Sequence, residues 1–287
     1  MNYGPRPWVQ QHWDLRAAAN FTCGGAGAGL IAWTAAMALA GTSAAAGVPA
    51  LLLAGLALVG IGLGCVALEL GRPLRALNVF RNPRTSWMSR EAIAATLLVA
   101  VTLALAWGAG TAAAPAAATL AVVLALAFVW CQGRMLHAAR GIPAWRSSAT
   151  PALMAATALT EGAGLWWLTA PWHGQGTHAA LAGFGVLIVL RLIAWLAHRR
   201  SVAAHRRVAA ALAPAGVSLG ALGTLAPLAL IVVAAMLGDG AWGLALAALA
   251  GALAFGAGAA FKLALILRGS FNQGFAVERM PVRGTRA

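Results

Sequence analysis

The chain has 287 residues, of which 61% are hydrophobic and only 9% are charged. A soluble globular domain carries about 25% charged residues, so this composition excludes that class and predicts an integral membrane protein. The formal net charge of +14 would suit a nucleic-acid-binding protein, but the arginines lie in short clusters between apolar runs, so we expect no nucleic-acid partner.

Apolar segments follow one another along the whole chain, and each is long enough to cross a bilayer at about 20 residues per span. We expect an all-α polytopic membrane protein with eight transmembrane helices in one bundle, surrounded by membrane lipid. The predicted helices cover residues 16–40, 48–70, 90–112, 116–138, 150–170, 179–198, 208–237 and 241–268. They form a membrane domain of residues 16–270, between an N-terminal segment of residues 1–15 and a tail of residues 271–287.

The connections between these helices alternate in charge. Lysine and arginine are absent near residues 41–47, 111–115, 171–178 and 238–240, whereas residues 71–90, 139–149, 199–207 and both ends of the chain are rich in arginine. Cytoplasmic loops of membrane proteins carry the excess of positive charge. An even number of helices therefore places both termini in the cytoplasm.

The longest polar stretch runs from Glu69 to Glu91, between the second and third helices. It carries five arginines, namely Arg72, Arg75, Arg81, Arg84 and Arg90. Because these helices are antiparallel neighbours, the two carboxylates lie at the same depth, which suits a proton-accepting pocket. Each could instead pair with a nearby arginine at the membrane interface.

Glu161, Arg191 and Lys262 also fall inside predicted helices, where an unpaired charge is costly. Glu161 lies roughly 16 Å and Arg191 roughly 10 Å from the cytoplasmic ends of their helices, at about 1.5 Å per residue. A buried Glu161–Arg191 ion pair is therefore possible, and we favour it over a proton path. Lys262 either extends to the interface or points into a polar cavity beside residues 71–90.

The six histidines bear on whether the chain carries a cofactor. None is central to a span with a partner at matching depth, as axial ligation of a membrane haem requires. We therefore expect no haem and no metal in this chain. His137 ends the fourth helix at the same membrane face as Glu69, Glu91 and Lys262.

The polar stretch resembles a known family. It reads Leu-Gly-Arg-Pro-Leu-Arg-Ala-Leu-Asn at 70–78, Arg-Asn at 81–82 and Ser-Trp-Met-Ser-Arg-Glu at 86–91, and Phe-Val-Trp at 128–130 precedes Ile-Pro-Ala-Trp at 142–145. These residues resemble the membrane-anchor subunit of dimethyl sulfoxide reductase, an eight-helix anchor of complex iron–sulfur molybdoenzymes, and more distantly the polysulfide-reductase type. The opening at residues 2–8 is faintly similar to anchors of phenylacetyl-CoA:acceptor oxidoreductases.

The resemblance implies an electron-transfer function in anaerobic respiration, at the bacterial inner membrane. It implies a site for ubiquinone or menaquinone close to a four-cluster ferredoxin-like iron–sulfur subunit, which connects to a molybdopterin or tungstopterin catalytic subunit. In this family a histidine implicated with the quinol precedes the Leu-Gly pair, and here that position is Glu69. Glu91 matches an acid of the family.

We therefore expect Glu69, Glu91, His137 and Lys262 to form a quinone-binding, proton-accepting group, because oxidising a quinol releases protons as well as electrons. The arginines of the polar stretch, Arg72, Arg75, Arg81, Arg84 and Arg90, together with Trp87, are expected to dock the partner. Two alternatives stay open. One is a secondary transporter, for which Glu161 and Pro227 are the hints; the other is a passive membrane scaffold without a quinone site.

Overall fold

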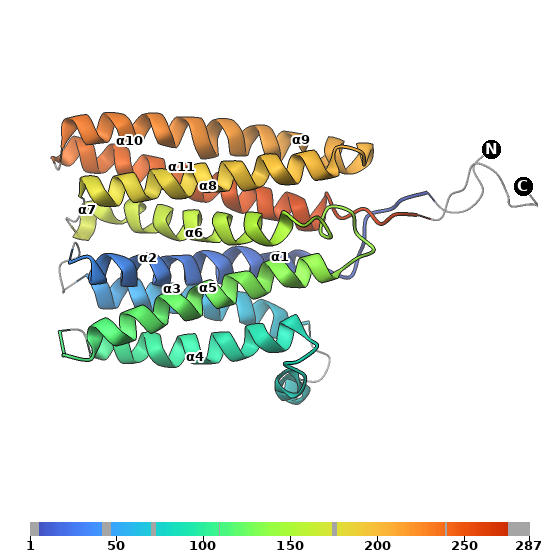
Figure 1. Ribbon diagram of the computed structural model, residues 1–287, viewed down its shortest axis with the longest axis horizontal. Coiled ribbons are helices and arrows are strands. Elements are labelled where there is room, and N and C mark those ends of the chain that lie inside the picture. The colour runs from blue at the N-terminus through green and yellow to red at the C-terminus, as the bar shows by residue number, and fades with distance from the viewer. Residues whose placement is uncertain are drawn as a thin grey trace, which may run out of the picture.

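The structure of the protein is a computed structural model that describes residues 6–41, 47–69, 73–108, 110–173, 177–238 and 240–274. Long helices lie side by side in one bundle (Figure 1). In chain order the elements are α1 (Leu15–Ala19), η1 (Asn20–Gly24), α2 (Gly25–Leu39), α3 (Val48–Ala67), η2 (Pro73–Arg81), α4 (Trp87–Trp107), α5 (Ala114–Ala138), α6 (Thr150–Leu168), α7 (Ala170–His173), α8 (His178–Val202), α9 (Arg206–Gly220), η3 (Ala221–Leu225), α10 (Ala226–Leu237) and α11 (Ala241–Leu267).

The expected all-helical membrane architecture is confirmed. In the described part of the chain, seven helices are long and apolar enough to cross a membrane: Leu15–Leu39, Val48–Ala67, Trp87–Trp107, Ala114–Ala138, His178–Val202, Arg206–Leu237 and Ala241–Leu267. The first and sixth of these each contain a turn of wider π-helix, η1 and η3 respectively. Most of their bounds lie within a few residues of those that the apolar runs predict.

The start of the third helix illustrates why bounds shift. The sequence suggests a start near residue 90, but α4 begins at Trp87 because Ser86 is its N-cap, with the Ser86 hydroxyl accepting from the Ser89 backbone N–H at 3.3 Å. A side-chain oxygen at the N-cap satisfies one of the unpaired N–H groups of the first turn. Glu91 therefore lies just beyond the first turn, facing inward.

Helix α6 lies in the middle of the bundle, between α2 and α11 (Figure 1). Its 19 residues include the buried polar side chains of Thr157, Thr160 and Glu161. Helices α3, α4 and α5 extend the bundle on the α2 side, and α8, α9 and α10 extend it on the α11 side. The residues on α6 therefore decide how the two halves meet.

Glycines bring α6 close to both neighbours. A methyl group added to Gly162 would meet the backbone of Gly29 and Leu30 on α2, and one added to Gly164 would meet the Gly251 carbonyl on α11. Small residues permit this approach of helix backbones within a membrane, where dispersion contacts replace the hydrophobic effect as the driving force. Close packing at these contacts fixes the position of α6.

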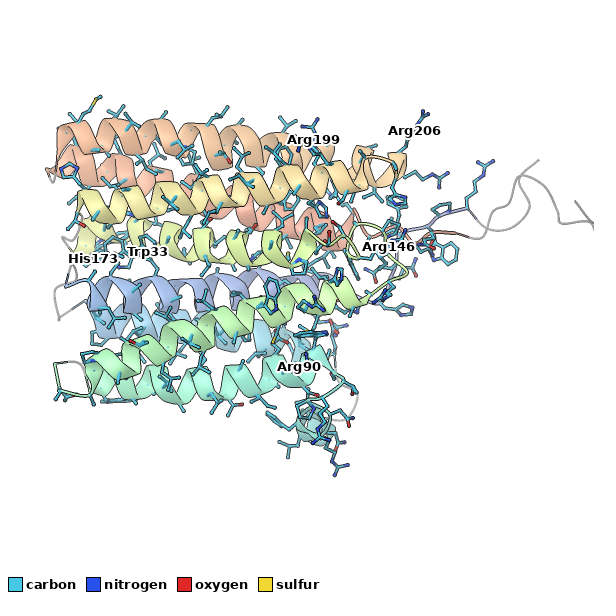
Figure 2. The ribbon with its side chains drawn as sticks, in the orientation of Figure 1. Trp33, Arg90, Arg146, His173, Arg199 and Arg206 are labelled. Carbon is cyan, nitrogen blue, oxygen red and sulfur yellow. The ribbon has the colours of Figure 1, made fainter. Side chains whose placement is uncertain are left out.

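The arginine-rich connections gather at one end of the bundle, as the alternation of charge predicts. Figure 2 shows Arg90, Arg146 and Arg206 toward the same end. The segments just outside the bundle also meet there: Gln10 N–H donates to the Ser270 carbonyl at 3.1 Å, and Asn272 N–H donates to the Trp8 carbonyl at 2.9 Å. We call this end the polar end.

The Gly162 contact gives a test of the bundle. We expect Gly162→Ala to lower the free energy of unfolding by about 1–3 kcal/mol, because the added methyl group forces α2 and α6 apart. Thermal unfolding of the purified protein in mild detergent measures this change. Gly64→Ala on α3 is the matched control: nothing lies within 4 Å of its added methyl group, and alanine favours a helix over glycine by up to about 1 kcal/mol. Equal melting temperatures for the two variants would contradict the packing.

Candidate functional site

A cavity of about 420 Å³ opens at the polar end of the bundle. Four parts of the chain surround it: α1 with η1, the end of α3, η2, and the facing turns of α4 and α5. Its lining residues are Trp13, Ala17, Asn20, Phe21, Leu63, Val66, Ala67, Glu69, Ala76, Val79, Met88, Glu91, Ala92 and Met135. A mostly apolar wall with a few convergent polar groups is typical of a small-molecule site, and here those groups are Asn20, Glu69 and Glu91.

Glu91 forms the inner polar corner of this cavity. Its side chain is only 4% exposed. The Asn20 amide donates to Glu91 Oε1 at 3.4 Å, and the side chain of Gln132 lies beside the same carboxylate. Gln132 also donates to the Asn20 backbone carbonyl at 3.2 Å. Two amides thus hold the carboxylate, while Asn20 Oδ1 has no hydrogen-bond partner among the described residues.

Glu69 lies at the outer rim, with its side chain 27% exposed. Arg16 Nε approaches Glu69 Oε1 to 3.8 Å, and Arg16 also contacts Asp14 at 2.9 Å. Partial burial, followed by the hydrogen bond and the charge of Asp14, raises the pKa of Glu69. The hydrogen bonds from Arg16 lower the pKa of Asp14 to about 2. Of the two acids, Glu69 is therefore the one that holds a proton more readily.

A wider helical turn connects this cavity with the interior of the bundle. In η1, the Asn20 carbonyl accepts from Gln132 and the next carbonyl, Phe21, accepts from Lys262 Nζ at 2.9 Å. π-Type turns within α-helices are frequent at functional sites. Here the turn presents two consecutive carbonyls to side chains from α5 and α11.

Lys262 forms an ion pair with Glu161 at 2.5 Å, and neither side chain is exposed. Glycines leave space for both groups: a methyl group on Gly25 would lie 2.7 Å from Lys262 Nζ, and one on Gly258 would lie 2.8 Å from Glu161 Oε1. Lys262 therefore points inward rather than toward the interface. It lies behind η1 rather than in the lining of the cavity.

The expected pairing of Glu161 with Arg191 is corrected by this geometry. Arg191 is also fully buried, but it donates to the Ala254 carbonyl at 2.8 Å and to the Gly223 carbonyl within η3. Backbone carbonyls of α11 and of a wider turn thus bind the guanidinium. The lysine on α11 reaches the carboxylate because α6 and α11 pack closely through glycines.

His137 lies outside the cavity lining. Its Nδ1 is 3.0 Å from the Ser147 carbonyl in the connection between α5 and α6. That contact holds the connection against the end of α5. Of the four residues expected to form the proton-accepting group, the structure brings Glu69 and Glu91 into one cavity and places His137 and Lys262 elsewhere.

The expected docking residues fall into two groups. Arg81 and Arg84 are exposed at the polar end, whereas Arg90 donates to the Pro83 and Arg84 carbonyls at 2.7 Å each and lies 4.2 Å from the Trp87 ring centre. Arg90 and Trp87 therefore fold the stretch against α4. Arg72, and the side chain of Arg75, lie outside the described residues.

Asn20 and Gln132 are the site residues that sequence reasoning missed. Each is the amide side chain of an apolar helix, and each is almost fully buried. Polar side chains within a span are costly in hydrocarbon. That cost is the signal that could have identified them, in the same way that it identified Glu161.

The ion pair predicts a large effect of removing one partner. We expect Lys262→Met to lower the free energy of unfolding by about 3–5 kcal/mol, because Glu161 loses its countercharge in a buried site. The double variant Glu161→Gln/Lys262→Met removes both charges and should recover much of that loss. Thermal unfolding of both variants in the same detergent measures the coupling. If Lys262→Met has the same melting temperature as the unaltered protein, the ion pair contributes nothing to the free energy of unfolding.

Comparison with known proteins identifies the family of this chain. A model of the family "DMSO reductase anchor subunit" matches residues 21–238, which is more than half of the chain and includes Glu69, Glu91 and Glu161. A search of curated proteins found no match. The fainter similarity to phenylacetyl-CoA:acceptor oxidoreductase anchors stays a prediction. The chain belongs to the family of DMSO reductase anchor subunits, the membrane anchors of molybdoenzyme complexes.

Proposed function

We propose that the chain is the quinone-reactive anchor of a molybdopterin and iron–sulfur oxidoreductase. It would exchange electrons between the quinone pool and a cytoplasm-facing iron–sulfur subunit. The observation that carries this proposal is the cavity of about 420 Å³ in which Asn20, Glu69 and Glu91 converge. Membership of the anchor family supports it, since an anchor of this type assembles with iron–sulfur and catalytic subunits.

The lining fits a quinone head group. Leu63, Val66 and Met135 provide apolar walls, and the volume falls in the range of about 300–1,000 Å³ that small-molecule sites occupy. Asn20 Oδ1 is a buried acceptor without a partner in the described chain. A hydroxyl of a quinol can donate to such an acceptor, so the site offers one hydrogen bond that the protein itself does not use.

The two carboxylates suit the proton chemistry. Quinol oxidation supplies two electrons to an acceptor and releases two protons, one from each hydroxyl. Glu91 would accept a proton at the buried corner, with its position held by the Asn20 and Gln132 amides. Glu69 would accept the second at the rim, where its 27% exposure lets it return the proton to water.

Electron exchange requires the partner's clusters to approach the cavity, and η2 provides the surface. Ala76 and Val79 of η2 line the cavity, while Leu77, Phe80, Arg81 and Arg84 are exposed. One element therefore separates the cavity from the outer surface. We propose that a four-cluster ferredoxin-like subunit binds this surface through apolar contact and acidic groups, and passes electrons to a molybdopterin or tungstopterin subunit.

The topology follows from the polar end. We count α6 as an eighth span, because it lies inside the bundle between α2 and α11. Glu161, Thr157 and Thr160 make this helix less apolar than the other spans, and each of the three has a partner within the protein. With the arginine-rich end inside, both termini and the cavity would face the cytoplasm of a bacterial inner membrane. Family membership favours this anchor over a transporter, and the variants below distinguish it from a passive scaffold.

Glu91→Gln tests the proposal directly. We expect quinone-linked turnover to fall by about 10²-fold, the lower range for losing a positioned proton acceptor, with the iron–sulfur and catalytic subunits still co-purifying. Thr96→Val, on the exposed face of the same helix, should retain full turnover. If Glu91→Gln keeps both assembly and turnover, the chain is a scaffold or its quinone site lies elsewhere.

The rim acid predicts a pH dependence. Only ionised Glu69 can accept a proton, and its pKa is raised, so turnover in quinol oxidation should rise with pH through a value above the usual glutamate range. Glu69→Gln removes the titrating group, so this rise should disappear and turnover at high pH should fall. Rates measured from acidic to neutral pH for both forms provide the comparison. An unchanged pH profile in the variant would assign the proton transfer to another group.

A further inference from the structure

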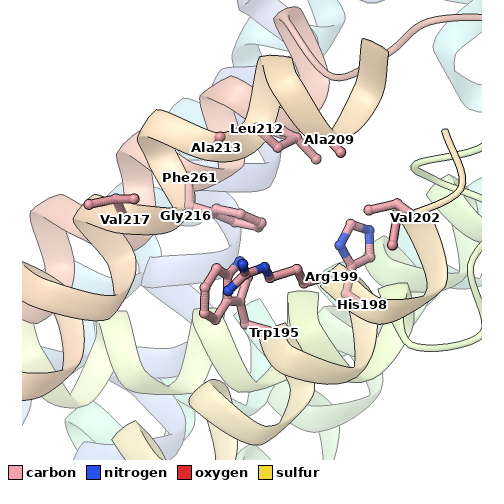
Figure 3. Close-up of a pocket in the computed structure, with 11 residues that line it drawn as sticks. Trp195, His198, Arg199, Val202, Ala209, Leu212, Ala213, Gly216, Val217 and Phe261 are labelled. Carbon is pink, nitrogen blue, oxygen red and sulfur yellow. The ribbon is translucent and has the colours of Figure 1, made fainter. Parts of the chain in front are cut away.

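A second groove, of about 330 Å³, lies at the polar end on the other side of the bundle. It is formed by the end of α8, the start of α9 and the facing part of α11 (Figure 3). It shares no lining residue with the cavity that contains Glu69 and Glu91. No step of the proposed function uses it, so its role must be argued from its own residues.

The groove carries an unneutralised positive charge. The Arg199 guanidinium lies over the Trp195 ring, 5.5 Å from its centre (Figure 3). The Arg199 guanidinium forms neither a hydrogen bond nor an ion pair with any described residue, and no acidic residue is among those that line the groove. The chain continues with Arg200, Arg206 and Arg207, so this mouth of the groove lies in a strongly positive environment.

The other titratable residue in the lining, His198, is already engaged in a hydrogen bond. His198 is almost fully buried, and its Nε2 lies 2.8 Å from the Ala144 carbonyl. Because a carbonyl only accepts, Nε2 carries the hydrogen of that bond. His198 thus ties α8 to the connection between α5 and α6, and Arg199 is left as the charged group of the groove.

Beyond Arg199 the walls are apolar and lead toward the lipid-facing surface. Leu212 and Phe261 are buried at the base, whereas Val217 at the far rim is 71% exposed. Gly216 makes room for the indole: a methyl group added there would lie 2.8 Å from Trp195 Cζ2. The groove therefore joins a cation and a half-buried tryptophan at one end to an apolar exit at the other.

We propose that this groove binds one anionic phospholipid, with the phosphate on Arg199 and an acyl chain along Trp195 and Val217. Charge complementarity identifies the head group, since the groove offers a guanidinium and no countercharge. Arginine is suited to phosphate because its planar fork donates two parallel hydrogen bonds. Basic pockets between membrane helices near the cytoplasmic face bind anionic head groups by the same physics.

The test uses the full chain in its purified complex. After lipid is removed in detergent, phosphatidylglycerol or phosphatidylcholine with the same acyl chains is added, and native mass spectrometry counts the bound lipids. We expect phosphatidylglycerol to bind more tightly. Arg199→Gln should weaken its binding about fivefold, the factor that one arginine contributes at an anionic membrane surface, and should weaken phosphatidylcholine binding less, because the choline cation of that lipid offsets its phosphate charge. Arg140→Gln, an exposed arginine at the same end but outside the groove, is the control.

A second variant tests the acyl-chain part of the proposal. Ala213 is an exposed lining residue, so Ala213→Phe should fill the groove without disturbing the bundle, and it should weaken phosphatidylglycerol binding while Arg199 remains. Equal binding of the two lipids, or an Arg199→Gln variant that binds like the control, would overturn the proposal. So would displacement of the lipid by inorganic phosphate with no effect of Ala213→Phe, since that result would assign a site for a free anion.

Discussion

A charge buried among membrane helices needs an opposite charge or backbone carbonyls as partners, and the Lys262–Glu161 ion pair meets this requirement at the centre of the bundle. The two groups lie 2.5 Å apart with no exposure to solvent. Their contact needs α2, α6 and α11 to approach closely, which Gly25 and Gly258 permit. A methyl group at either glycine would lie within 3 Å of one member of the pair, so that member would have to shift. The glycines and the charges therefore specify the same arrangement of helices.

The same pair also supports the cavity at the polar end. Lys262 donates to the Phe21 carbonyl of η1, and Gln132 donates to the carbonyl of the preceding residue, Asn20. The Asn20 side chain then donates to Glu91. Each of these contacts fixes a group that would otherwise be costly to bury. The carboxylate proposed to accept a proton is thus held by a chain of polar contacts that ends at the buried Lys262–Glu161 ion pair.

The long helices could be predicted from the sequence because glycine and proline separate the apolar runs. A hydropathy profile detects such runs directly. The meeting of Glu69 and Glu91 was also predictable, since neighbouring antiparallel helices must place both ends of their connection at one depth. The partner of Glu161 was not, because hydropathy does not state which helices touch. Arg191 contacts carbonyls of η3 and α11, and π-type turns have no strong sequence signal. His137 shows the same limit: shared depth does not establish a shared cavity.

The positions of the acidic residues make one side of the polar end acidic and leave the other side basic. The sequence has six acidic residues and twenty basic ones, and Asp14, Glu69 and Glu91 all lie around the first cavity or its rim. A positive environment favours the ionised form of a carboxylate and so offsets part of the desolvation that opposes it. Proton acceptors can therefore exist beside the membrane without being neutralised outright. The second groove lacks such acids, so the same surplus of arginine remains available there to an anion. The excess of positive charge at the polar end thus supports both the acidic cavity with Glu69 and Glu91 and the basic groove with Arg199, on opposite sides of α6.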